Sequence, residues 1–213
     1  MLPAVVEPVG WNPMFHHIAK DGMPGGLLNS CDAPRSIFWI STIAANGVVN
    51  LAPYSFSSAV AYKPPQVMFA ITGLREDGRE AHTLVNSRAT SEFVVNFVPY
   101  RLREQMNRTS TPVEADVDEM ALARLHPAPS RLVKPPGVQE SPIRLECRVD
   151  RIIDLAGHHN TMVIGQVVGI FIDESVLVDG QVQWTAYGPV ARLGRGDGYT
   201  HVTSQWAMPR PRA

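Results

Sequence analysis

Short polar side chains gather between residues 50 and 58, in the segment NLAPYSFSS just ahead of the apolar stretch QVMFAI. They are the amide of Asn50 and the hydroxyl groups of Ser55, Ser57 and Ser58. Such groups can hydrogen-bond to the edge of a polar heterocycle without adding charge to the site. The alternative interpretation is that these residues only form turns that face water. The pattern makes this segment a candidate binding site.

A second polar cluster follows one apolar strand later, in the loop TGLREDGREAHT at residues 72–83. It offers Arg75, Arg79 and His82, and it places Thr83 at the start of a predicted short helix. Phosphate is favoured there, because free backbone N–H groups and the positive end of the helix dipole lie at a helix N-terminus. The alternative is that Arg79 is only solvated and Thr83 only caps the helix. Together the two clusters suggest one nucleotide-like ligand.

Motifs for other chemistries are missing from the sequence. It contains no GxGxxG that opens a helix after a strand, and no Walker, HExxH, CxxC or GxSxG sequence, so a Rossmann domain has no support. Histidines are adjacent in two places, His16–His17 and His158–His159. The two side chains of each pair would point to opposite faces of a strand, and neither pair has acidic or thiolate ligands to support a metal. No local motif supports a Ser-His-Asp triad. We therefore predict no metal site and assign no catalytic acid, base or nucleophile.

The elements that would position the two clusters are mostly strands. Alternating or apolar runs predict strands, and helical patterns follow the second cluster. The predicted strands are 35–42, 48–52, 66–71, 92–97, 143–157 and 160–173, and the predicted helices are 83–90, 100–108 and 114–125. The Asn-Gly pair in AANG favours a type I′ hairpin turn after the first strand. The prediction is a mainly β fold, an antiparallel β-barrel with helical insertions.

Length and composition favour a single globular domain. The chain has 213 residues, of which 45% are hydrophobic and 18% charged, enough to bury one substantial core. We divide it into an N-terminal arm (1–30), a domain (31–203) and a flexible C-terminal tail (204–213). The proline-rich stretch 126–142 is interpreted as an ordered connection, because strand patterns resume directly after it.

Charge and hydropathy exclude several classes of partner. The formal net charge is -1 and the sequence pI is about 6.7, so we expect no nucleic acid and no anionic lipid surface as partner. No stretch approaches the ~18 apolar residues of a membrane span, and the first residues lack a basic signal region. Cys31 and Cys147 are expected to be reduced, packed thiols. These features predict a cytoplasmic protein.

Several blocks, in chain order, resemble the flavin reductase-like family. They are RSIFWISTIAANGVVNLAPYSFSSAVAYKPPQVMFAI, HTLVNSRATSEFVVN, ESPIRLECRV, MVIGQVVGIFID and PVARLG…Y. Within the family, the sequence is most similar to the small reductase partners of two-component flavin monooxygenases, of the nitrilotriacetate monooxygenase component B type. The likeness extends from about residue 30 to about residue 200, and NLAPYSF is its most specific block.

This resemblance implies an FMN-binding split β-barrel that forms a homodimer with FMN near the subunit interface. It also implies an NAD(P)H-dependent flavin reductase. Such an enzyme uses NADH or NADPH as co-substrate and transfers hydride from the nicotinamide to flavin N5. The implied protein partner is a flavin-dependent monooxygenase that receives the reduced flavin.

Site residues carry over from the family one by one. The isoalloxazine and ribityl contacts of the NxAPxSF block match Asn50, Ala52, Ser55, Phe56 and Ser57. The loop that holds the phosphate matches Thr72, Arg79 and Thr83. Where the family usually has Lys-Asp-Thr, this chain has Ala81-His82-Thr83. The lost lysine shifts anion binding to Arg79, with Arg75 and His82 as further candidates.

Other departures leave the activity open. Gln166 stands where glutamate is common, and Phe171 where histidine is common; both changes would alter the face on which nicotinamide stacks. A flavin-binding or carrier protein without nicotinamide oxidation is therefore the alternative, and a barrel that binds no flavin is a third. For the homodimer, strands 35–42 and 160–173 are expected to form the interface, with Phe38, Trp39 or Phe171 as anchors.

Overall fold

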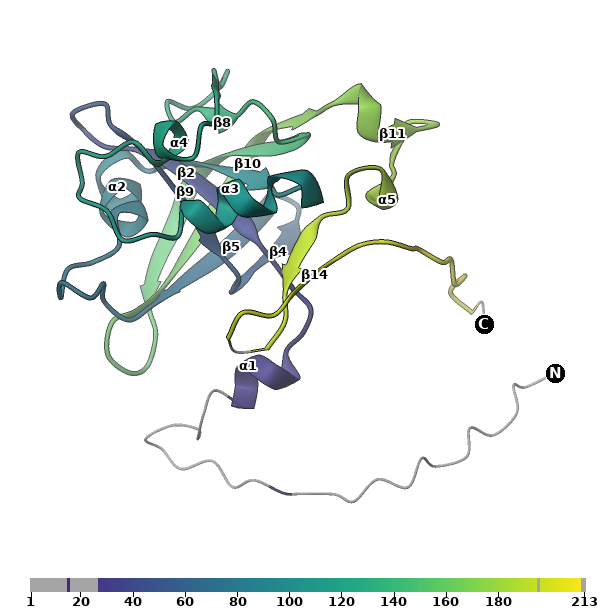
Figure 1. Ribbon diagram of the computed structural model, residues 1–213, viewed down its shortest axis with the longest axis horizontal. Helices are drawn as coiled ribbons and strands as arrows, with labels where there is room; N and C mark the ends of the chain where they lie inside the picture. The colour runs from purple at the N-terminus through teal and green to yellow at the C-terminus, as the bar shows by residue number, and fades with distance from the viewer. Residues whose placement is uncertain (1–14, 16–26, 195, 212–213) are drawn as a thin grey trace.

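The computed structural model describes residue 15, residues 27–194 and residues 196–211 (Figure 1). Most of the predicted arm, the pair His16–His17 and the last two residues of the predicted tail therefore lie outside the described residues.

The described chain consists mainly of antiparallel strands. The longer strands are β2 (Phe38–Ile43), β3 (Val49–Tyr54), β4 (Ser57–Tyr62), β5 (Pro65–Thr72), β6 (Glu92–Phe97), β9 (Ile143–Asp154) and β10 (Asn160–Ile172). The shorter ones are β1 (Arg35–Ser36), β7 (Pro127–Ala128), β8 (Gly137–Val138), β11 (Leu177–Val178), β12 (Gln181–Val182), β13 (Val190–Arg192) and β14 (Tyr199–His201). The helices are α1 (Leu27–Cys31), α2 (His82–Thr90), α3 (Arg103–Arg108), α4 (Glu119–Leu122), α5 (Trp184–Tyr187) and the 3-10 turns η2 (Tyr100–Leu102) and η3 (Glu174–Val176).

One seven-stranded sheet carries the fold, with strand order β3-β2-β6-β9-β10-β5-β4 and every pair antiparallel. Strands β3 and β4 are its outermost strands, yet only Ser55 and Phe56 separate them in the chain. So short a link requires the sheet to curl until its two ends meet at this corner (Figure 1). The mainly β fold with helical insertions is therefore confirmed.

Strand β2 is buried on both faces, because it lies between two hydrophobic clusters. Trp39, on one face, packs with residues of α3 and α4 such as Met106 and Met120. Phe38 and Ile40, on the other face, join the cluster inside the curled sheet. Successive side chains of a strand point to opposite faces, so the run FWI serves both clusters at once.

Strand register agrees with the hydrophobic alternation, and the turns differ in detail. The predicted hairpin of residues 143–157 and 160–173 forms, with Thr161 opposite Asp154 and Ile172 opposite Ile143. The AANG turn also forms, but of its residues only Gly47 has a positive φ, at 89°. A type I′ turn needs positive φ at both central residues, so that turn type is wrong.

Two predicted elements are shorter than their sequence patterns. The helix expected at 114–125 is reduced to α4, because Asp118 accepts hydrogen bonds from the N–H groups of Met120 (2.8 Å) and Ala121 (3.1 Å) and so starts the helix late. The strand expected at 35–42 divides at Ile37 into β1, which pairs with β13, and β2, which pairs with β3 and β6.

Both cysteines are free thiols, as predicted. Cys147 is buried, but Cys31 is exposed, so the prediction that both are packed is wrong for Cys31. No helix within the described ranges is long and apolar enough to cross a membrane.

Candidate ligand-binding site

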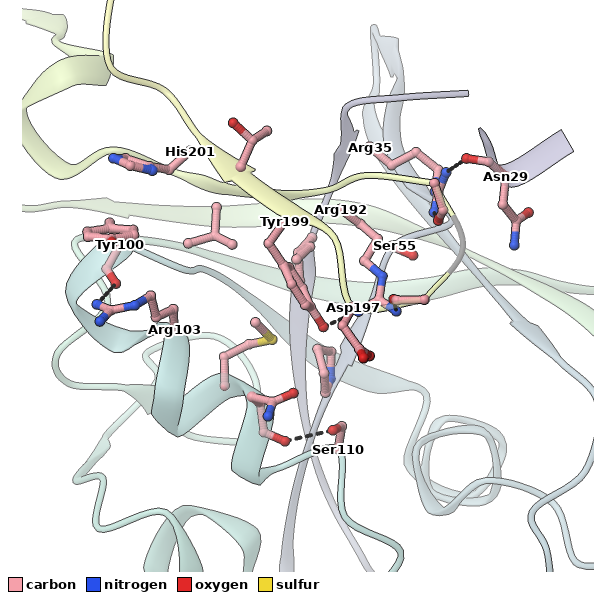
Figure 2. Close-up of a pocket in the computed structure, with 18 of the residues that line it drawn as sticks. Asn29, Arg35, Ser55, Tyr100, Arg103, Ser110, Arg192, Asp197, Tyr199 and His201 are labelled. Carbon is pink, nitrogen blue, oxygen red and sulfur yellow. Dashed lines mark hydrogen bonds between the residues drawn. The ribbon is translucent and has the colours of Figure 1, made fainter. Parts of the chain in front are cut away.

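Two cavities lie along β3, one toward each end of the strand. The first, here called the β3–α2 cavity, has a volume of about 330 Å³. It is lined by Asn50, Ala52, Pro53, Tyr54, Leu74, Arg75, Glu76, Ala81, His82, Thr83, Thr109, Ser110, Pro112 and Glu119. The second, the β3–α3 cavity, has a volume of about 860 Å³ and lies between α3 and β14 (Figure 2). Pro53 and Ser110 line both cavities, which are therefore neighbours.

The unpaired edge of β3 forms the common wall of these cavities. Strand β3 pairs only with β2, so alternate residues direct their backbone groups away from the sheet. One such group, the N–H of Leu51, donates to Glu119 Oε2 at 3.1 Å. Two residues on, Pro53 has no N–H to satisfy, which is why proline is tolerated in this strand. The backbone edge is thus left available to a ligand.

Buried polar side chains fix α2 against β3. Asn50 Nδ2 donates to Thr83 Oγ1 at 2.8 Å, and Asn86 Nδ2 donates to Thr42 Oγ1 at 3.1 Å. Burial raises the pKa of Tyr54, which lines the same cavity, to about 12. The predicted residues Asn50 and Thr83 are therefore brought together, 33 residues apart in sequence. Their hydrogen bonds hold the first turn of α2 at the cavity.

Arg75 lies in the β3–α2 cavity, and only 16% of its side chain is exposed. Its guanidinium donates to the carbonyl of Val113 at 2.6 Å and contacts His82 Nδ1 at 3.1 Å. It also lies 3.3 Å from Asp77. Burial, with the positive charge of Arg75, lowers the pKa of His82. A cation and a neutral imidazole therefore lie together at the start of α2, of which His82 is the first residue.

Glu119 is the buried acid of this cavity, with 4% of its surface exposed. Burial raises the pKa of Glu119 to about 7, and the hydrogen bond from Leu51 N–H opposes part of that rise. The sequence pattern gave no functional signal for Glu119, which lies inside an ordinary amphipathic run, EMAL. Only the fold shows that its carboxylate reaches the edge of β3.

Three predicted site residues line neither cavity. Arg79 is 54% exposed and bonds to Asp77 (2.7 Å) and Glu114 (3.0 Å). Thr72 is exposed at the end of β5. Ser57 Oγ donates to the carbonyls of Ser36 and Tyr54 at 3.0 and 3.1 Å, so it stabilises the corner between β3 and β4.

The β3–α3 cavity contains the other two predicted residues, Ser55 and Phe56. Figure 2 shows Ser55 and Arg35 on one side of it and Tyr100, Arg103 and His201 on the opposite side. The block PVARLG…Y carried no functional signal in the sequence beyond the family resemblance. In the fold, its Arg192 and Tyr199 line this cavity.

The two residues that depart from the family pattern and leave the choice between reductase and flavin carrier open lie away from both cavities. Gln166 and Phe171 are exposed on β10, and the guanidinium of Arg144 lies 3.7 Å from the centre of the Phe171 ring.

Phe38 and Trp39, expected as interface anchors, are 3% and 0% exposed because the two core clusters enclose them. That part of the interface prediction is wrong, since neither side chain can reach a partner.

Metal-binding geometry is not found within residues 27–194 and 196–211, where no group of three or more His, Cys, Asp or Glu residues could hold an ion. His158 and His159 lie in the turn between β9 and β10.

Comparisons with known proteins agree with this fold. Residues 30–186 match the model of the flavin reductase like domain. An uncharacterised protein of Halalkalibacterium halodurans is 33% identical over 189 residues, which cover 87% of this chain and 90% of that protein. Nitrilotriacetate monooxygenase component B from Bacillus cereus superposes with a TM-score of 0.84 and 27% identity, covering 92% of this chain and 100% of that one. A split barrel domain protein from Shewanella frigidimarina gives a TM-score of 0.78 at 24% identity, with 92% and 100% covered.

The curled antiparallel sheet is thus a split β-barrel. The chain belongs to the flavin reductase-like family.

Glu119 leads to a prediction about pH. Because its folded pKa of about 7 lies above the usual 4.5, the folded state binds more protons between these values, and the free energy of unfolding falls as pH rises through them. We expect Glu119→Gln, which can still accept from Leu51 N–H, to reduce this fall by about 1–2 kcal/mol after allowance for solvent screening. Urea denaturation at about pH 5 and about pH 8 measures it. The matched control is Glu174→Gln, at an exposed position; an equal effect there would contradict the assignment.

Proposed function

We propose that this protein binds FMN along the edge of β3 and acts as an NAD(P)H-dependent flavin reductase. The FMN phosphate would lie in the β3–α2 cavity, and the ring would lie toward Ser55 and Phe56. Family membership supports a flavin-related oxidoreductase, and the likeness to a monooxygenase component B supports a role in supplying reduced flavin to an oxygenase. The observation that carries the proposal is the pair of neighbouring cavities on one open strand edge.

The phosphate end is supported by three independent features. Helix α2 begins after Ala81 without a side-chain cap, so its first N–H groups can donate hydrogen bonds to an anion. Arg75 Nε is buried and has no hydrogen-bond partner among the described residues. Such an unsatisfied donor is costly unless a ligand completes it. His82 lies beside it and could donate a further hydrogen bond.

Arg75 therefore suits the phosphate better than Arg79. Asp77 and Glu114 already satisfy the Arg79 guanidinium, at 2.7 and 3.0 Å. Moving Arg79 to a ligand would break both ion pairs, whereas Arg75 already lines the cavity. The loop 72–83 keeps the phosphate-binding role predicted from sequence, with Arg75 in place of Arg79 as the residue that would hold the phosphate.

When bound, FMN supplies the hydride-accepting chemistry, and the chain needs to bind and orient it. The backbone edge of β3 would hydrogen-bond to the ring, and the corner at Ser55 and Phe56 would limit how far the ring can slide. No acid or base is required of the protein for direct hydride transfer.

A flavin-binding or carrier protein remains the second candidate. Gln166 and Phe171 depart from the family pattern and lie outside both cavities. One chain therefore offers them no contact with a ligand in either cavity, and any influence on nicotinamide would act through a second subunit.

Rapid mixing of FMN-loaded protein with NADH, and separately with NADPH, tests the reductase. We expect loss of the oxidised-flavin absorbance with at least one of the two. Protein that stays yellow with both would support the carrier instead. Colourless protein whose melting temperature does not rise with added FMN would contradict flavin binding itself.

Substitution of Arg75 tests the phosphate end. Arg75→Gln should weaken FMN about tenfold or more while changing riboflavin little, since a charge-assisted hydrogen bond contributes ~1.5–3 kcal/mol and riboflavin has no phosphate. Arg79→Gln makes the same change in the same loop, outside the cavity, and should leave the FMN-to-riboflavin ratio within about twofold. A larger effect at Arg79 would return the phosphate to that residue. Fluorescence titration gives the affinities, and melting curves confirm folding.

We also propose that two chains form a homodimer that completes the site. The end of β10 exposes apolar side chains on both of its faces: Ile170 (63%) and Ile172 (37%) on one, and Phe171 (41%) on the other. These residues replace Phe38 and Trp39 as anchors. Sedimentation at micromolar concentration should show a dimer that FMN tightens by mass action. A monomer fully loaded with flavin would contradict this assembly.

A further inference from the structure

The β3–α3 cavity extends well beyond the residues expected to touch flavin. Its volume of about 860 Å³ lies near the upper end of the range of roughly 300–1,000 Å³ for small-molecule sites. Ser55 lies on one side, and Tyr100, Arg103 and His201 lie on the other (Figure 2). We call this far side the Arg103 end.

Two stacked groups make the Arg103 end rigid. The Arg103 guanidinium lies 4.3 Å from the centre of the Tyr100 ring, and the His201 ring stacks on Tyr100 at 3.9 Å and 19°. Tyr100 is thus sandwiched, with Arg103 on one side and His201 on the other (Figure 2). Its ring is occupied on both faces, but it fixes the direction in which Arg103 presents its N–H groups.

Arg35 and Arg103, two of the three arginines that line this cavity, differ in how many of their N–H donors are free. Arg35 is 6% exposed, and its terminal nitrogens bond to the carbonyls of Asn29, Asp32 and Gly194, so it has a structural role. Among the described residues, the Arg103 guanidinium has polar contacts only with the Tyr100 carbonyl (3.1 Å) and Glu104 (3.4 Å), although it has five N–H donors. Arg103 can therefore still bind an anion.

An aromatic surface lies in the same cavity. The ring of Tyr199 is 38% exposed and has Arg192 over it at 4.4 Å. Met106 adds a buried apolar contact. An exposed ring, an apolar surface and a cation with free donors together favour a flat ligand that carries a negative charge.

Charge in the cavity favours a single anionic group. Arg35, Arg103 and Arg192 contribute three positive charges, and Glu104 and Asp197 two negative ones, among the described lining residues. The sum is +1 with His201 neutral. One carboxylate balances this charge, whereas a ligand with several phosphates would meet the two acids.

From these features we infer that the Arg103 end binds a small planar aromatic carboxylate as a second ligand beside the flavin. The carboxylate accepts hydrogen bonds from Arg103, and the ring packs against Tyr199 and Met106. This inference concerns a ligand in addition to FMN, so it can fail while the proposed flavin site stands.

Calorimetric titration of the FMN-loaded protein with benzoate, and with its neutral counterpart benzamide, tests the inference. We expect saturable benzoate binding that is about tenfold tighter than benzamide, the ratio of one charge-assisted contact. Arg103→Gln should abolish this preference, and Arg103→Lys should keep part of it. Arg108→Gln, the same change at an exposed position of the same helix and outside the cavity, should leave it unchanged.

Three outcomes would overturn the inference. Benzoate and benzamide could bind equally, which would remove the role of Arg103. Benzoate could bind only when FMN is absent, which would make the whole cavity part of the flavin site. NAD⁺ could displace benzoate, which would assign the Arg103 end to a nucleotide. The flavin absorbance, recorded in the same samples, reports failure of FMN binding separately.

Discussion

The unpaired edge of β3 is the constraint on which the site depends. An edge strand leaves backbone N–H and C=O groups without partners, and a protein must cover or satisfy them. Here Glu119 accepts the N–H of Leu51, and Pro53 removes the next outward donor. Both cavities border this edge. A ligand with a flat polar edge can therefore pair with β3 as a neighbouring strand would, so the flavin site proposed here would need no Rossmann motif.

Burial of β2 keeps that edge in place. Because both faces of β2 contribute to the core, a register slip of one residue would exchange Trp39 and Phe38 between two differently shaped clusters. The indole of Trp39 donates to Thr109 Oγ1 at 2.8 Å, and Thr109 lines the β3–α2 cavity. The register between β2 and β3 then places Asn50 where its side chain can hydrogen-bond to Thr83 of α2. Core packing and site geometry are thus coupled through one strand.

Sequence patterns predicted the fold well where alternation was strong. The hairpin of β9 and β10 and the buried strands β5 and β6 agree with their apolar runs, and Asn50 and Thr83 do meet. The pattern could not show that Asp118 delays α4, or that Asp77 and Glu114 hold Arg79 away from the cavities. Such outcomes depend on which side chains meet after folding. Glu119 and Arg103 were missed for the same reason, since each lies in an unremarkable helical run.

The cost of the open edge is visible in the electrostatics of the β3–α2 cavity. Satisfying Leu51 N–H requires a buried oxygen, and the chain uses a carboxylate whose pKa burial raises to about 7. When ionised, Glu119 disfavours a phosphate in the same small cavity, so a cation must oppose it. Arg75 lies there with an unsatisfied Nε. The acid that accepts the strand N–H and the arginine proposed to hold the ligand therefore share one cavity and interact through their charges, so changing either should alter how the other is charged or paired.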